Sequence, residues 1–158
     1  MTSPTQYFLC SGDSEGFTTL NAFDAALLKA GVGNTNLVRM SSILPPGIVR
    51  IEPVPLVPGC FLPIAYSCIQ SSTPQVMIAA AVAVAVPKDP SLPGVIMEYS
   101  ALGTAGDAEK SARSMAREAL QIRGWVVGEI LSATVEHQVE TIGAAFAGVA
   151  LIGEAQHG

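Results

Sequence analysis

The sequence predicts an α+β fold in one domain spanning residues 1–158. Two segments place apolar residues at helical spacing, and about seven others have the alternation or β-branched content typical of strands. Helices and strands are segregated along the chain instead of alternating strictly, which favours α+β over a wound parallel sheet. The length is that of a single domain, and no repeat or linker divides it.

The first helix is predicted to begin at a threonine cap, Thr18 or Thr19, and to end near Ala30, with Gly31 just beyond it. Helical spacing predicts a buried face made of Leu20, Phe23, Leu27 and Ala30.

The chain on either side of this helix is predicted to be extended. Tyr7–Cys10 is interpreted as a short strand and Ser11–Gly16 as a turn-rich loop. Asn36–Met40 is predicted to be a strand, and its alternation places Leu37, Arg39 and Ser41 on one side. Six prolines between residues 45 and 63 then favour an extended connector over a central strand.

Three further strands are expected at Cys60–Gln70, Val76–Val86 and Gly94–Ser100. The second has the clearest period of two, because Val82, Val84 and Val86 alternate with alanines. Such a strand has one bulky face and one small face, and another layer can approach the small face closely.

The second helix is predicted over Thr104–Arg123, with Thr104 as its cap and Gly124 ending it. Two strands, Trp125–Ile130 and Ser132–Val139, and a buried Gly- and Ala-rich strand, Gly143–Gly153, are expected to follow. Helical spacing predicts an apolar stripe of Ala108, Ala112, Met115, Ala119 and Ile122.

Composition narrows the classes of function. Hydrophobic residues make up 49% of the chain and charged residues 13%, a surface that favours burial between subunits. A net charge of −5 without a basic run argues against nucleic-acid and membrane partners. The N-terminus lacks the features of a signal peptide, and three cysteines fit no metal spacing, so we expect a cytoplasmic protein with reduced thiols and no metal.

The run from Arg39 to Pro46 contains two adjacent serines before two prolines. One interpretation is a strand end entering a proline-stiffened turn. The other is self-cleavage, because the Ser42 hydroxyl can attack the carbonyl carbon of Ser41 and turn the amide into an ester. β-Elimination would then release the Ser41 carboxylate, and loss of ammonia would leave residue 42 as a pyruvoyl group.

Seven motifs in order make the chain resemble the pyruvoyl-dependent arginine decarboxylase family across roughly residues 11–152, and this resemblance favours self-cleavage. The motifs lie at Leu20–Leu28, Gly33–Arg39, Ser41–Pro46, Val86–Asp89, Ile96–Tyr99, Arg123–Trp125 and Val135–His137.

The resemblance implies a four-layer αββα sandwich that processes itself into two chains, 1–41 and 42–158. It also implies homo-oligomers, trimers or hexamers, with active sites at subunit interfaces. The implied reaction is decarboxylation of L-arginine to agmatine and CO2 through a Schiff base to the pyruvoyl group made from Ser42, without a metal.

The resemblance also assigns roles to individual residues. Ser41 and Ser42 form the self-cleavage site, and Ser42, Glu98 and Asn36 are the implied catalytic residues. Glu98 is the implied donor of a proton to the substrate Cα, and Asp24 and Ser41 are the implied substrate-binding residues.

Two alternatives remain open at this point. One is a pyruvoyl decarboxylase for another amino acid, such as histidine, and the other is an unprocessed, non-catalytic homologue. His137 is interpreted separately as a structural residue, because it shares a strand side with Val135 and Val139 and should have a buried, hydrogen-bonded ring.

Overall fold

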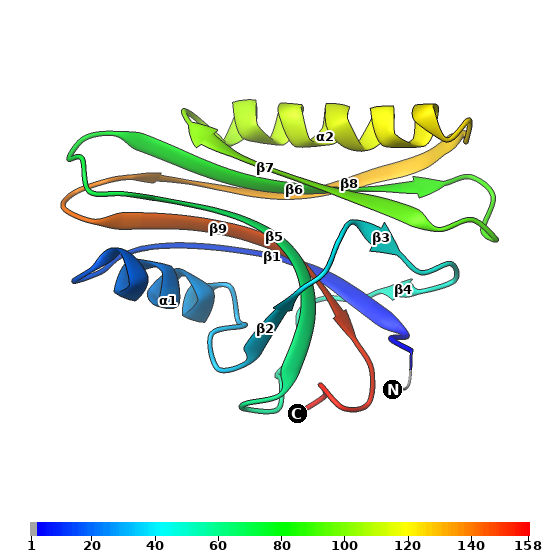
Figure 1. Cartoon of the computed structure of the whole chain (residues 1–158), viewed down its shortest axis with the longest axis horizontal. Helices are drawn as coiled ribbons and strands as arrows, with labels where there is room; N and C mark the ends of the chain where they lie inside the picture. Colours follow the sequence, from blue (N-terminus) through cyan, green and yellow to red (C-terminus); the bar gives the residue numbers. More distant parts are fainter. Residues whose placement is uncertain (1–2) are drawn as a thin grey trace.

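The computed structural model describes residues 3–158 and has four layers, with one helix on the outer face of each of two stacked sheets (Figure 1). The helices are α1 (Thr19–Lys29) and α2 (Ala105–Ile122). The five-stranded sheet has the order β2 (Asn36–Arg39), β5 (Phe61–Ser71), β9 (Gly143–Ile152), β1 (Gln6–Glu15) and β4 (Val49–Arg50). The four-stranded sheet has the order β3 (Ile43–Leu44), β7 (Gly94–Leu102), β6 (Met77–Pro87) and β8 (Val127–Gln138). The αββα prediction is confirmed.

Three hydrophobic cores fill the spaces between the four layers. The core between the sheets contains the bulky residues of β6, including Val82 and Val84, packed against β9. The alanines of β6 face the other way and pack against α2, as the alternation predicted. The third core joins α1 to the five-stranded sheet around Phe146. Strand β9 is buried along its whole length, as expected of a central strand covered on both faces.

Both helices have the predicted caps, and each predicted buried face is confirmed in part, at Leu27 of α1 and Ala30 just after it, and at Ala108, Ala112 and Ala119 of α2. Thr18 caps α1 and Thr104 caps α2. The prediction was wrong for Leu20, which is 71% exposed, and for Met115 and Ile122, which are exposed on α2. The buried residues that the prediction missed are mostly small: Ala22 and Ala26 of α1, and Ala116 of α2.

Each helix lies close to its sheet, and this short distance explains why small residues form most of its buried face. A Cβ on Gly12 of β1 would overlap the carbonyl oxygen of Ala26, so the backbones of α1 and β1 lie too close for a large side chain between them. On the other side, the alanine face of β6 gives α2 the same close approach. Close packing therefore selects alanine over the larger apolar residues that hydrophobicity alone favours.

Some strand boundaries also differ from prediction. All residues but the last of the expected loop at Ser11–Gly16 form the second half of β1, which pairs with β9 over ten residues. The two expected strands after α2 form one strand, β8, and the proline-rich connector contains the short strands β3 and β4. Pairing partners brought by the tertiary fold override the local sequence preference in each case.

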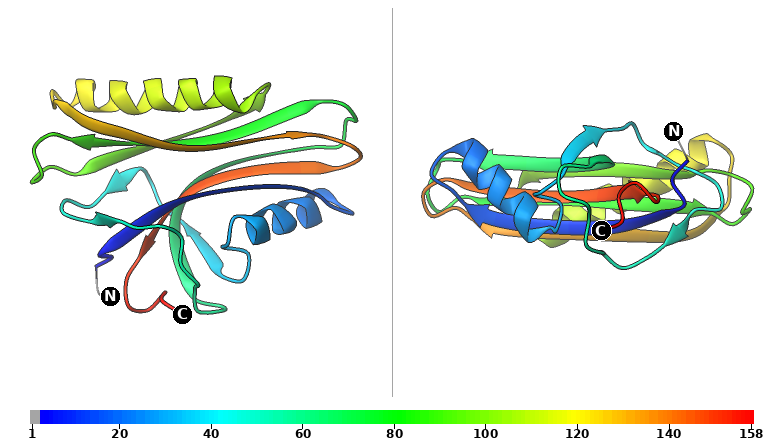
Figure 2. Two further views of the ribbon diagram at one scale, coloured as in Figure 1. Left: turned by 180° about the vertical axis from the view of Figure 1, so that it is seen from behind. Right: turned by 90° about the horizontal axis from the view of Figure 1, so that it is seen from below.

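The cysteines Cys10, Cys60 and Cys68 are free thiols, and burial raises the pKa of Cys10 to about 12. Neither helix in residues 3–158 is long and apolar enough to cross a membrane. Seen from behind and from below, the long strands of both sheets run in roughly the same direction, and the view from behind shows α1 and α2 at opposite faces (Figure 2).

Candidate active site

The predicted cleavage segment crosses from one sheet to the other. Strand β2 lies at the edge of the five-stranded sheet and β3 at the edge of the four-stranded sheet, so residues 40–42 span the gap between them (Figures 1 and 2). The amide of Met40 donates to the Ile64 carbonyl at 3.1 Å, and the amide of Ile96 donates to the Ser42 carbonyl at 2.7 Å. Hydrogen bonds to both sheets thus hold the segment at its two ends. Between them Ser41 is exposed and Ser42 is half-buried.

Strand β7 brings Glu98 to the same place. Glu98 lies two residues after Ile96, which bonds Ser42, so both side chains are on the face of β7 that looks into the space between the sheets. The Oε2 atom of Glu98 is buried and has no hydrogen-bond partner among residues 3–158. Burial raises the pKa of the Glu98 carboxyl, and the charge and hydrogen bond of Arg39 oppose this rise without cancelling it.

Arg39 is a member of this site that the sequence analysis did not assign. Its guanidinium lies 3.5 Å from Glu98 Oε1, donates to the Tyr66 carbonyl at 2.8 Å, and stacks 4.4 Å from the centroid of the Tyr66 ring. Tyr66 itself packs against Phe146 and Phe23, with ring centroids 5.4 Å and 6.4 Å away. The one sequence signal was the alternation that put Arg39 and Ser41 on the same side of β2.

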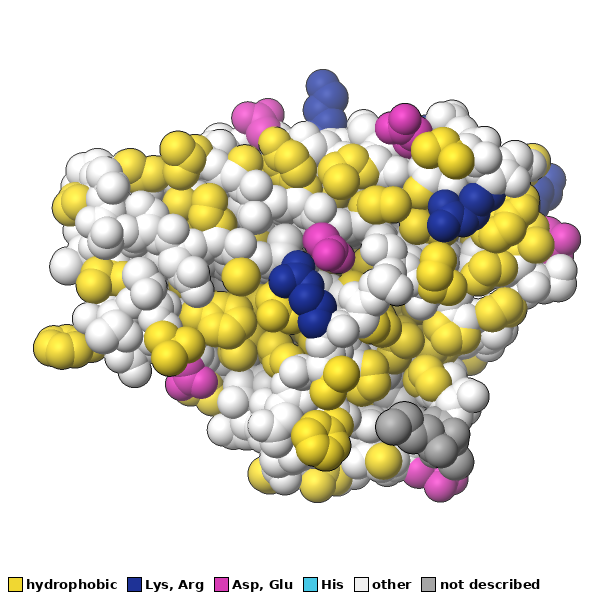
Figure 3. Space-filling view, viewed as in Figure 1, with side chains coloured by type: hydrophobic (Ala, Val, Ile, Leu, Met, Phe, Trp, Pro, Cys, Tyr) yellow, Lys and Arg dark blue, Asp and Glu magenta, His cyan; other side chains and the backbone are white. Residues whose placement is uncertain are grey.

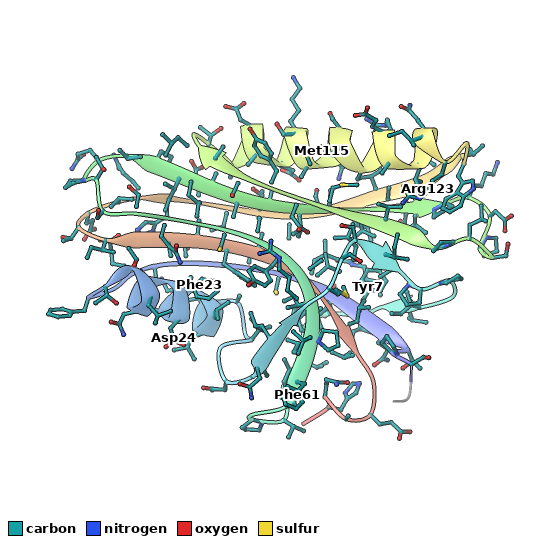
Figure 4. All side chains as sticks on the ribbon, viewed as in Figure 1. Tyr7, Phe23, Asp24, Phe61, Met115 and Arg123 are labelled. Carbon is teal, nitrogen blue, oxygen red and sulfur yellow. The ribbon has the colours of Figure 1, made fainter. Side chains whose placement is uncertain are left out.

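The other two predicted residues, Asp24 and Asn36, lie away from Ser42 and Glu98. Asp24 is exposed on the side of α1 that points away from the sheets (Figure 4). Asn36 begins β2, and its Nδ2 donates to the Gly59 carbonyl at 2.9 Å. Neither makes a hydrogen bond or ion pair to Ser41, Ser42 or Glu98 in the single chain. The structure therefore brings together Ser42 and Glu98 but leaves Asp24 and Asn36 apart from them.

Comparison with known proteins identifies the family. The profile of the family described as "Pyruvoyl-dependent arginine decarboxylase (PvlArgDC)" matches residues 6–153. A Methanocaldococcus jannaschii protein named pyruvoyl-dependent arginine decarboxylase is 50% identical over 149 residues, which cover 94% of this chain and 90% of the relative. The chain belongs to the pyruvoyl-dependent arginine decarboxylase family.

More distant relatives agree with this assignment. Proteins of the same name from Methanococcus maripaludis and Thermococcus kodakarensis are 45% and 43% identical and cover 94% and 88% of this chain, with 91% and 88% of their own lengths matched. A solved structure described as pyruvoyl-dependent histidine decarboxylase at pH 8 matches with a TM-score of 0.52 and 16% identity. That match covers 61% of this chain and 52% of the other, and it supports the fold alone.

The residues around position 42 fit the covalent pyruvoyl group for which the decarboxylase family is named. Ser42, its predicted source, is present, and its carbonyl accepts a hydrogen bond from the Ile96 amide. The unpartnered, buried oxygen of Glu98 is a group that can hold a proton near that position. No group of three or more His, Cys, Asp or Glu side chains within residues 3–158 is arranged to hold a metal ion.

His137 lies in a separate cluster that joins the two sheets. Its Nδ1 lies 2.8 Å from Asp13 Oδ2 and its Nε2 lies 2.5 Å from Glu15 Oε2, so β8 is bonded to β1. Glu15 Oε1 also accepts from the amides of Thr141 and Ile142. The predicted hydrogen bonding of the ring is confirmed, whereas the ring is partly and not fully buried, and its two partners lie in the segment that was expected to be a loop.

Proposed function

We propose that this chain cleaves itself between Ser41 and Ser42 and then decarboxylates L-arginine to agmatine and CO2. Membership of the family gives the reaction class. The single observation that supports these residue roles is the hydrogen bond from the Ile96 amide to the Ser42 carbonyl. Glu98 lies two residues after Ile96 on the same face of β7, so its unpartnered oxygen is near the proposed cleavage segment.

The cleavage needs one water and no oxidant. The Ser42 hydroxyl attacks the Ser41 carbonyl, and the C–N bond breaks as the ester C–O bond forms. In the elimination the Cα proton of residue 42 is removed and the bond between the ester oxygen and Cβ breaks, which leaves the new carboxyl group of Ser41 and a dehydroalanine. After tautomerisation, water replaces the nitrogen, which leaves as ammonia and takes up the proton released by the new carboxyl group. Two hydrogen-bonded ends, at Met40 and Ser42, restrict the segment while this happens.

Each proposed site residue has one task in the decarboxylation. When formed, the pyruvoyl group supplies a ketone that condenses with the substrate amine and accepts the electrons released with CO2. Glu98 holds a proton in a desolvated position and delivers it to the substrate Cα. Asp24 accepts hydrogen bonds from the substrate guanidinium, aided by the new carboxylate of Ser41. Asn36 orients the reacting groups by hydrogen bonds.

This assignment requires more than one chain at each site. Asp24 and Asn36 do not reach Ser42 within a single chain, so a neighbouring copy must present them. The exposed surface supports this assembly, because Phe17, Leu20, Phe61 and Ile122 are each more than 70% exposed. Figure 3 shows a face on which hydrophobic side chains are abundant and charges are few. A trimer, or a hexamer built from two trimers, would cover such surfaces.

The deciding experiment compares the protein with Ser42→Ala by intact mass under denaturing conditions and by product analysis. The unsubstituted protein should give two pieces, 1–41 and 42–158, and should make agmatine from arginine but no histamine from histidine. Ser42→Ala should remain one chain without activity, because no hydroxyl is left to attack. Histamine without agmatine would identify a histidine enzyme, and an intact, inactive unsubstituted chain would identify a non-catalytic homologue.

A further inference from the structure

We infer that Arg39 is a positioning residue for Glu98: it engages Oε1 of the carboxyl group and so directs Oε2 toward the substrate carbon at position 42. This inference rests on the proposed function of Glu98 as proton donor. Arg39 itself touches neither substrate nor the reacting atoms in this role.

The contacts of Arg39 are more extensive than those of an ordinary surface ion pair. Its side chain is 55% exposed, and exposed pairs are worth little because water competes for both partners. Here, however, the guanidinium is also held by the Tyr66 carbonyl and by the face of the Tyr66 ring. Tyr66 is in turn fixed by Phe146. Arg39 therefore presents its N–H groups to Glu98 in one direction.

The carboxyl group of Glu98 is consequently restrained at one oxygen. A carboxyl group can rotate about its last side-chain bond, and that torsion is broad. The ion pair between Oε1 and the guanidinium at 3.5 Å favours one orientation and leaves Oε2, which is buried and unpartnered, as the oxygen available to carry a proton. The site thus has one oxygen for orientation and one for chemistry.

Arg39 also influences the pKa of the Glu98 carboxyl group. Burial among apolar neighbours, including Val82 opposite it on β6, raises the pKa of Glu98, and Arg39 is the charged group that lowers it. Besides Glu98 and the Tyr66 ring, Cys68 of β5 is a titratable group near Arg39, and burial raises the pKa of its thiol despite the cation. Glu98 therefore depends on Arg39 for both its direction and its acidity.

The first test measures the Glu98 carboxyl group without any turnover. Carbon-13 NMR titration of glutamate-labelled Ser42→Ala protein, with Glu98→Gln to assign the signal, gives the pKa of Glu98 in the uncleaved chain. Adding Arg39→Met should raise this pKa, because the cation is lost while the apolar stem remains over Tyr66. Arg50→Met, which removes a cation from the exposed pair with Glu52, is the matched control and should leave it unchanged.

The second test measures steady-state decarboxylation by processed enzyme. Arg39→Met should lower kcat by about 10- to 100-fold through loss of orientation, with KM for arginine little changed. The alkaline limb of its pH profile should move to higher pH, because a weaker acid keeps its proton longer. Arg39→Lys keeps the charge but not the planar fork, so it should restore the pH profile and only part of kcat.

Two results would overturn the inference. One is a Glu98 pKa that does not change in Arg39→Met, and the other is a raised KM with an intact kcat, which would make Arg39 a substrate contact. If Arg39→Met does not fold, Arg39→Gln in the Ser42→Ala background allows the same titration. Failure of the unsubstituted protein to decarboxylate arginine would contradict the proposed function, whereas the titration would still report on the Arg39–Glu98 pair.

Discussion

At the scale of single residues, Glu98 carries the most specific prediction about chemistry. Glu98→Gln keeps an oxygen for Arg39 but has no acidic proton to deliver, so kcat at saturating arginine should fall by about 10²–10⁴. Substrate binding should persist. The measurement requires protein shown by mass to be cleaved and to carry the pyruvoyl group. A processed Glu98→Gln enzyme with nearly unchanged kcat would remove Glu98 from the mechanism.

Asp24 carries the corresponding prediction about specificity. Asp24→Asn keeps the shape and removes the charge that a guanidinium requires, at a cost of about 2–5 kcal/mol in arginine binding. KM for arginine should therefore rise strongly while self-cleavage continues at its normal rate. Both are measured on one preparation, by kinetics and by the time course of intact mass. Unchanged arginine kinetics would mean that the Asp24 carboxylate does not bind the substrate guanidinium.

The residues of the site were predictable from the sequence to different degrees. Ser42 and Glu98 came from motifs that resemble the family, and the fold brings them together. The Arg39 contacts were not predictable, because they join β2 of one sheet to β7 of the other and no local pattern encodes that approach. In the proposed assembly Asp24 and Asn36 would come from a neighbouring chain, whose position a single sequence does not give.

At the scale of secondary-structure elements, the cluster of His137, Asp13 and Glu15 predicts how stability depends on pH. Burial works to lower the pKa of His137, but its bonds to Glu15 and Asp13 raise it above the usual value. Burial likewise works to raise the pKa of Glu15, but its hydrogen bonds lower it to about 2. The His137 contribution is thus complete below its unfolded pKa and is lost as pH rises through the folded one. The Glu15 contribution is lost as pH falls toward about 2.

The test is the free energy of unfolding of His137→Gln in the uncleaved Ser42→Ala protein. At pH 6 the substitution should cost about 1.5–3 kcal/mol, the usual net value of hydrogen bonds to charged groups. At pH 9 the cost should be smaller, because the unsubstituted histidine loses its proton as the pH rises through its raised pKa. Glu136→Gln, an exposed neighbour on β8, is the control and should cost little at either pH. A cost independent of pH would contradict a charged His137.

The elements themselves were largely predictable, and the errors share one cause. Caps, the alternation in β6 and the apolar run of β9 are local signals, and the structure agrees with them. Leu20 was wrongly assigned to the buried face of α1, and Ala22 and Ala26 were missed, because the closeness of Gly12 to Ala26 is a property of two segments, not of the helix. The second half of β1 was taken for a loop because its partner, β9, lies more than a hundred residues away.

At the scale of the whole molecule, the proposed cleavage would leave two interlocked pieces. Residues 1–41 include α1 and β1, and β1 lies between β9 and β4 of the five-stranded sheet. Ten paired positions join β1 to β9, so the pieces cannot separate without opening that sheet. We expect them to elute together in size-exclusion chromatography of processed protein and to separate only in denaturant. Release of the 1–41 piece in native buffer would contradict this arrangement.

The central position of β1 also changes the kinetics of folding once the chain is cut. An intact chain closes the β1–β9 ladder within one molecule, at a rate that does not depend on protein concentration. After cleavage the same ladder forms between two separate polypeptides, so its rate of formation becomes second order and falls with dilution. The mature protein would then recover poorly from denaturation, although its uncleaved precursor folds readily. We therefore expect the folded state to form efficiently only from the uncleaved precursor.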